Sequence, residues 1–94
     1  MNSMLKKMFI DPLLENQWVL EKYNTYQVNM HKKFHPLDII SIEFDQQKNL
    51  YLLSLPILYK NYSVKNKFNL FLKFNNYLEL CNYLQYYLQE YLTY

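Results

Sequence analysis

The sequence predicts an α+β domain in which a small antiparallel β-sheet of about three meandering strands packs against a C-terminal amphipathic helix. Two patterns support this prediction. In residues 40–44 and 64–74, apolar and polar residues largely alternate, which is typical of half-buried strands. From residue 77 to 92, apolar residues return every three or four positions, as on a helix that covers a core. At 94 residues, we expect residues 1–94 to form a single domain with a modest core.

The N-terminal third, residues 1–36, allows a short helix. Asp11 followed by Pro12 is typical of an N-cap and a first helical residue, because the N–H that proline lacks would be unpaired there in any case. The helix would continue as far as Glu21 and include Leu13, Leu14, Gln17 and Trp18.

A long strand or a hairpin is the alternative structure for this third. The segment WVLEKYNTYQVNM, residues 18–30, alternates passably between apolar and polar residues, and Asn24-Thr25 could turn it. Pro36 disfavours helical backbone at His35. We therefore place the boundary between the N-terminal third and the rest of the chain at this dipeptide. The helix and the hairpin both remain open.

A second hairpin is predicted over residues 39–56. Its turn is the segment DQQKN at 45–49, and LYLLSLP forms its second strand, with apolar residues on both sides. That strand is expected to be central or covered on both faces, and Pro56 should end its pairing. The first strand places Ile40, Ile42 and Phe44 on one face and Ser41 and Glu43 on the other.

The segment KNKFNLFLKF, residues 65–74, predicts a third strand with all of its lysines on one face. The apolar face would hold Val64, Phe68, Leu70, Leu72 and Phe74. The other face would hold Lys65, Lys67, Asn69, Phe71 and Lys73.

The C-terminal helix is predicted to follow Asn75 or Asn76 as its N-cap, and with Asn76 as the cap Glu79 occupies the capping-box position. A helical wheel places Leu84 at the centre of the apolar face. The whole face comprises Tyr77, Leu80, Cys81, Leu84, Tyr87, Leu88, Tyr91 and Leu92.

The composition excludes several classes of site. The chain has no glycine, alanine or arginine, while Phe, Tyr, Met, Ile, Asn and Lys fill half of its positions. These six residues have AT-rich codons, so we infer an AT-rich genome, such as that of an organelle, a virus or a protist. Without glycine the chain cannot build phosphate loops, dinucleotide-binding turns or a nucleophile elbow. Without arginine it lacks a planar fork for phosphate, so specific phosphoryl chemistry is not expected.

The expected location is intracellular, in a mitochondrion, a plastid or the cytoplasm of a virus-infected host. The single cysteine, Cys81, excludes an internal disulfide framework and is compatible with a reducing compartment. The longest uncharged apolar stretch, residues 49–59, is much shorter than the roughly 20 residues that span a bilayer. We therefore expect no membrane span.

The lysine-bearing strand is a candidate nucleic-acid surface, on which lysines would follow the phosphates and Phe71 would stack on a base. We favour an ordinary solvated sheet face, because the net charge is only +2 and lysine is the only strong cation in this composition. The ranking depends on whether Glu43 and Asp45 lie beside these lysines. The candidates for phosphate contact are Lys65, Lys67 and Lys73.

Metal-ligating and catalytic residues show no specific pattern. His31 and His35 are four residues apart and Cys81 could add a third ligand, but a zinc motif needs a fourth donor or a defined open position. Glu43 and Asp45 are explained by strand alternation and a turn. We therefore expect no enzymatic activity, no metal and no cofactor.

The tyrosines suggest a protein interface. The chain has eleven, and the helical wheel points Tyr83 and Tyr86 away from the core. Aromatic rings with a polar tip suit interfaces, although AT bias explains surface tyrosines equally well.

The leading functional prediction is a non-enzymatic protein–protein interaction module, an accessory subunit of a larger assembly. An RNA- or DNA-binding protein, ribosomal proteins included, is the first alternative, and a virus- or phage-encoded inhibitor of a host protein is the second. The candidate interaction surface comprises Lys65, Lys67, Phe71, Lys73, Tyr83 and Tyr86.

Overall fold

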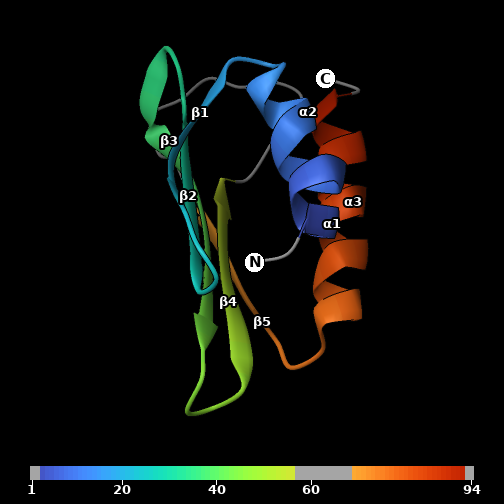
Figure 1. Cartoon of the computed structure of the whole chain (residues 1–94). Helices are drawn as coiled ribbons and strands as arrows, with labels where there is room; N and C mark the ends of the chain where they lie inside the picture. Colours follow the sequence, from blue (N-terminus) through green and yellow to red (C-terminus); the bar gives the residue numbers. More distant parts are fainter. Residues whose placement is uncertain (1–2, 57–68, 93–94) are drawn as a thin grey trace.

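The protein is a five-stranded antiparallel sheet with helices on one of its faces (Figure 1). The computed structural model describes residues 3–56 and 69–92. The strands follow chain order across the sheet: β1 (Trp18–Tyr23), β2 (Gln27–Lys32), β3 (His35–Asp45), β4 (Leu50–Pro56) and β5 (Asn69–Phe74). The helical elements are α1 (Ser3–Leu5), the π-helical turn η1 (Lys6–Ile10), α2 (Asp11–Leu14) and α3 (Tyr77–Leu92).

The predicted α+β class and the meander are confirmed, but the expected number of about three strands is wrong. The difference is the N-terminal hairpin of β1 and β2, which extends the sheet beyond β3. A longer meander lets both helical segments pack on one continuous sheet face.

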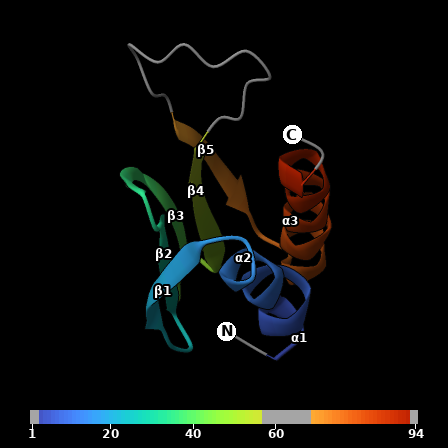
Figure 2. The same cartoon turned by 90° about the horizontal axis from the view of Figure 1, so that it is seen from above.

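The helices form one layer and the sheet forms the other (Figures 1 and 2). The N-terminal helical segment and α3 lie side by side on the same face of the sheet, as both views show. The core fills the space between the layers, because inward-facing strand residues meet the apolar sides of both helical segments. Its fully buried members include Leu5, Phe9, Ile10, Leu13, Val28, Met30, Ile40, Ile42, Leu55, Leu80 and Leu84.

The N-terminal third contains both of the structures that the sequence left open. Its helical part begins at Ser3 and ends at Leu14, so the prediction of a helix that starts at Asp11 and continues to Glu21 is wrong. Gln17 has a φ of 68°, a left-handed conformation that turns the chain out of the helix. Trp18 then begins β1.

Pro12 lies inside the helical segment, where its ring displaces the carbonyl four residues earlier and its missing N–H interrupts the hydrogen-bond ladder. The π-helical turn η1 directly precedes it, and the backbone N–H of Asp11 donates to the carbonyl oxygen of Lys6, five residues back. The wider turn thus lets the helix continue through Pro12.

Side-chain caps hold both predicted hairpin turns. The Oδ1 atom of Asn24 accepts hydrogen bonds from the backbone N–H groups of Tyr26 and Gln27, at 2.9 and 2.8 Å. The Oδ1 atom of Asp45 accepts from the N–H groups of Gln47 and Lys48, at 3.0 and 3.2 Å. Asn and Asp are favoured in turns for this reason, and both turn predictions are confirmed.

The expected boundary at His35-Pro36, between the N-terminal third and the rest of the chain, coincides with the start of β3. The predicted second strand of the central hairpin is β4, which lies between β3 and β5 and whose described residues run to Pro56. Pro56 is paired with Asn69, and the residues after it lie outside the described part of the chain. The described part of the third predicted strand is β5, whose even-numbered residues are partly buried and whose odd-numbered residues are exposed. Residues 64–68 of that prediction, with Lys65 and Lys67, lie outside the described residues.

Helix α3 has the predicted cap and the predicted inner face. The Oδ1 atom of Asn76 accepts from the backbone N–H groups of Leu78 and Glu79, at 2.8 and 3.3 Å. The hydroxyl of Tyr87 donates to the carbonyl oxygen of Pro56 at 2.9 Å and ties the helix to the end of β4. The described inner-face residues are Leu80, Cys81, Leu84, Tyr87 and Leu88, all buried, and the half-buried Tyr77.

Candidate interaction face

The sheet face opposite the helices is called the open face here. No helix of the described residues covers it (Figure 1). Its side chains are a mixture of apolar, polar and charged groups. The alternation of each strand brings these residues to the same side. They include Val19, Lys22, Gln27, Asn29, His31, Ile39, Ser41, Glu43, Asp45, Leu50, Leu52, Ser54, Asn69, Phe71 and Lys73.

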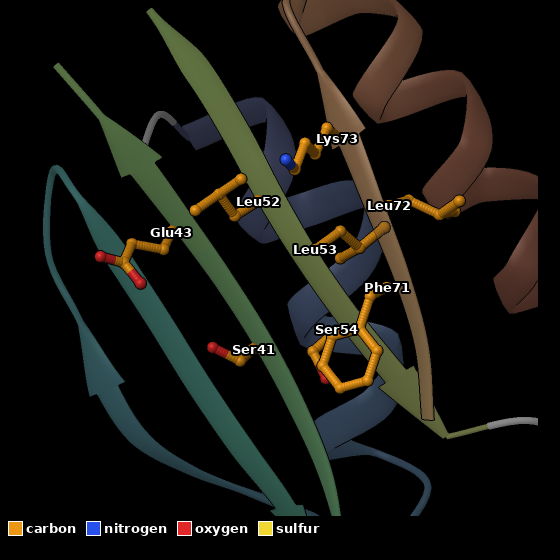
Figure 3. Close-up of a pocket in the computed structure, with 8 residues that line it drawn as sticks. All are labelled: Ser41, Glu43, Leu52, Leu53, Ser54, Phe71, Leu72 and Lys73. Atoms are coloured by element: carbon orange, nitrogen blue, oxygen red, sulfur yellow. The ribbon is translucent and has the colours of Figure 1, made fainter. Parts of the chain in front are cut away.

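A shallow groove of about 350 Å³ lies on the open face over β3, β4 and β5 (Figure 3). Its charged residues are Glu43 and Lys73, and its most exposed apolar residue is Phe71, which is 76% exposed. The complete lining is Ser41, Glu43, Leu52, Leu53, Ser54, Phe71, Leu72 and Lys73.

Two cross-strand rows define the groove, because the register pairs each open-face residue with one on the next strand. The first row runs Gln27, Glu43, Leu52, Lys73 from β2 to β5. The second row runs Asn29, Ser41, Ser54, Phe71.

The second row has small polar residues beside one large aromatic residue. Ser41 Oγ lies 3.2 Å from Asn29 Oδ1 and donates to it, and Asn69 Nδ2 donates to Ser54 Oγ at 3.3 Å. Serine side chains are short, so the floor of the groove is low at Ser41 and Ser54, whereas Phe71 is large and exposed; in Figure 3 its ring overlaps Ser54 and lies away from Ser41. The groove therefore has a depression next to a projection.

The first row shows how Glu43 lies relative to Lys73, which is one part of the question on which the nucleic-acid interpretation depends. Glu43 and Lys73 are on the same face, but β4 lies between them and contributes Leu52. Two strand spacings separate their backbones by about 10 Å. Lys73 is thus the described lysine of β5, and it shares the open face with a carboxylate rather than belonging to a purely basic surface.

The tyrosine candidates lie in the other layer of the fold, on α3. The prediction that Tyr83 points away from the core is wrong, because it is half-buried and its ring centroid lies 5.6 Å from that of Phe74. Burial raises the pKa of Tyr83, and the neighbouring Tyr86 raises it further. Tyr86 is 59% exposed, as expected. The predicted surface is therefore divided: Phe71 and Lys73 belong to the open face, and the two tyrosines do not.

The suggested metal ligands are not brought together. His31 is on the open face, with its Nδ1 atom 2.5 Å from Glu21 Oε1. His35 is exposed at the start of β3, whereas Cys81 is buried on α3, on the opposite side of the sheet. Within the described residues, no three His, Cys, Asp or Glu side chains cluster in a way that could hold a metal ion.

Cys81 packs beside Tyr77 in the helix layer. Burial raises the pKa of the Cys81 thiol, although its hydrogen bond with Tyr77 lowers it in part. Burial also raises the pKa of Tyr77, and Cys81 adds to that shift. Both groups are therefore neutral at physiological pH, and Cys81 acts as a small apolar residue, as predicted.

Cys81 should react slowly with the thiol reagent DTNB while the protein is folded, because both burial and a raised pKa reduce the accessible thiolate. We expect the rate at pH 8 to rise at least about tenfold in denaturant. The pKa of the Cys81 thiol is higher in the folded chain than in the unfolded chain. The thiol therefore makes its full contribution to the free energy of unfolding at pH values below the unfolded pKa, and this contribution decreases as the pH rises above the unfolded pKa. A rate that denaturant leaves unchanged would contradict the buried placement.

Sequence reasoning missed most of the open face. It identified Phe71 and Lys73 but not Ile39, Ser41, Leu52 or Ser54, because it could not determine which residues face one another across strands. The strand alternation already assigned Ser41 and Glu43 to the polar face, so the missing information was the cross-strand register.

None of the helices within residues 3–56 and 69–92 combines the length and the apolar character needed to cross a bilayer. Comparison with protein-family models, with curated proteins and with solved structures gives no match.

Proposed function

We propose that this chain is a non-enzymatic protein–protein interaction module, a small accessory subunit of a larger assembly, and that its partner binds the open face. The main support is that exposed Phe71, Ile39 and Val19 lie on a sheet face that the described helices leave uncovered. Scattered apolar surface residues are ordinary, but several on one sheet face are typical of a contact surface. Burial of this face would also add to the modest core of a small domain.

The charges on this face favour a protein partner over a nucleic acid. Glu43 lies in the same row as Lys73, and Glu21 lies beside His31. A phosphate backbone would meet these carboxylates as well as the lysine, whereas a protein surface can match both signs. Mixed charges around apolar residues resemble the rim and the centre of a protein interface.

Phe71 is the residue that we expect to anchor the partner. Its ring projects from β5 beside the low serine floor, so it can insert into a partner while the floor accepts a side chain in return. Large aromatic residues near the centre of an interface often account for much of its binding energy.

Photocrosslinking tests the proposal in the native source. The full-length chain with benzoylphenylalanine in place of Phe71 should give a nuclease-resistant adduct with protein. The same reagent at Leu78 is the matched control, because Leu78 is also an exposed apolar residue but lies on α3. Adducts from position 78 alone, or from neither position, would contradict the open face as the interface.

A salt titration separates this proposal from nucleic-acid binding. Three engaged lysines would give a slope of about −2 to −3 in log affinity against log salt. We expect only weak nonspecific RNA binding at physiological salt, with or without the combined change of Lys65, Lys67 and Lys73 to glutamine. A sub-micromolar RNA complex at physiological salt that disappears with this triple change would overturn the proposal.

A further inference from the structure

We infer that the open face binds the open face of a second copy of this chain, so that two sheets pack face to face around a two-fold axis. This inference rests on the proposed function, because it names the partner of the same surface. It depends on two complementary features of the groove, one of charge and one of size.

The charges are arranged symmetrically around Leu52. In the first row, Glu43 on β3 and Lys73 on β5 are each one strand away from Leu52 on β4, on opposite sides (Figure 3). A two-fold axis that runs parallel to β4, above Leu52, exchanges the two sides of the row. It places Glu43 of each copy opposite Lys73 of the other, with the two Leu52 side chains in contact between the ion pairs.

The same axis matches the sizes in the second row. Ser41 on β3 and Phe71 on β5 are each one strand away from Ser54 on β4. The axis therefore places the projecting Phe71 ring of each copy over the depression at Ser41 of the other. A face-to-face dimer is isologous, so each complementary pair occurs twice in the interface.

The spacing of packed sheets suits these contacts. Two sheets that pack face to face lie about 10 Å apart, with their strands within about 30° of each other. An axis parallel to β4 keeps the strands of the two copies nearly aligned, as this packing requires. Side chains that project from both sheets then meet midway between them.

The size of the sheet predicts a reversible dimer. With the axis at β4, only β3, β4 and β5 of the two copies overlap, and three strands about 4.8 Å apart and about six residues long cover on the order of 300 Å² of flat area per copy. This is smaller than the roughly 800 Å² per partner of a standard stable interface. We therefore expect dissociation in the micromolar range, and the measurement should extend to millimolar protein.

Charge reversal tests the arrangement, with sedimentation equilibrium of the purified full-length chain as the readout. Glu43→Lys would place two lysines opposite each other at both ion-pair positions, and Lys73→Glu would do the same with carboxylates. Each variant alone should dimerise at least about tenfold more weakly than the unmodified chain. An equimolar mixture of the two variants should associate again, because each ion pair in the mixed dimer then has opposite charges.

Matched controls change the same charges elsewhere. Lys7→Glu lies in the N-terminal helical segment and Glu15→Lys lies directly after it, and both residues are exposed. Neither should alter dimerisation, and circular dichroism should show that all four variants are folded. Phe71→Ala should also weaken the dimer, since it removes the projection that fills the neighbouring depression.

Each outcome supports or overturns the inference. A chain that stays monomeric up to millimolar concentration overturns it, and so does a dimer whose affinity the single reversals leave unchanged. Recovery of association in the mixture supports the two-fold arrangement, because no effect on folding could produce it. If the purified chain is monomeric but position 71 crosslinks to a different protein in the native source, the inference fails while the proposed function stands.

Discussion

Replacing Leu84 with alanine is expected to lower the free energy of unfolding by about 2 to 5 kcal/mol. Leu84 is fully buried at the centre of the inner face of α3, where it joins the core between the helices and the sheet. Alanine removes this apolar contact and leaves a cavity that closely packed neighbours fill only in part. A loss of this size would remove much of the stability of a small domain. Urea denaturation followed by circular dichroism measures it.

Gln85→Ala is the matched control for this change. It lies at the next position of α3, but its side chain is exposed, and alanine is a good helix former. We expect its denaturation midpoint to stay close to that of the unmodified protein. Equal midpoints for the two variants would show that the face of α3 centred on Leu84 does not pack on the sheet.

The period of the apolar pattern predicted the strands and the C-terminal helix because it follows from the backbone geometry of each element. Alternation between Ile40 and Phe44 requires one face of a strand to be buried, and the structure buries Ile40 and Ile42 there. The caps at Asn24, Asp45 and Asn76 were predictable for a similar reason, since each acts on backbone N–H groups two or three residues away.

The N-terminal third was harder to predict because two local preferences compete there. Asp11-Pro12 resembles the start of a helix, but the helix begins eight residues earlier, at Ser3, and the π-helical turn lets it continue through Pro12. Trp18 fits either a helix face or a strand face, and it is the left-handed turn at Gln17 that assigns it to β1. A π-helical turn has no clear sequence pattern, so the early start could not be inferred.

The candidate site was predictable only in part because it depends on contacts between distant strands. The sequence placed Phe71 and Lys73 on a polar face, which the structure confirms. It could not establish that β4 separates Glu43 from Lys73, because strand order is not encoded in the alternation of any one strand. Tyr83 was misplaced for a related reason: the helical wheel does not show that Phe74, on the preceding strand, lies beside it.

The early start of the N-terminal helix leads to the second large stability effect, which is expected for Phe9→Ala. Phe9 lies in η1, is fully buried, and its ring centroid is 6.5 Å from that of Tyr87 on α3. It therefore joins the two helical segments above the sheet. Removal of a buried phenyl ring typically costs about 3 to 5 kcal/mol, so this change should be at least as destabilising as Leu84→Ala. The same urea denaturation measures it.

Lys7→Ala is the control for this prediction, because Lys7 is exposed in the same π-helical turn and the substitution preserves helix-forming tendency. If Phe9→Ala and Lys7→Ala unfold at the same urea concentration, the N-terminal segment does not belong to the core. If only Phe9→Ala is strongly destabilised, residues 3–14 stabilise the same cooperative unit as α3. The open face would then be supported from behind by both helical segments, and a partner could bind it without any need to order the sheet first.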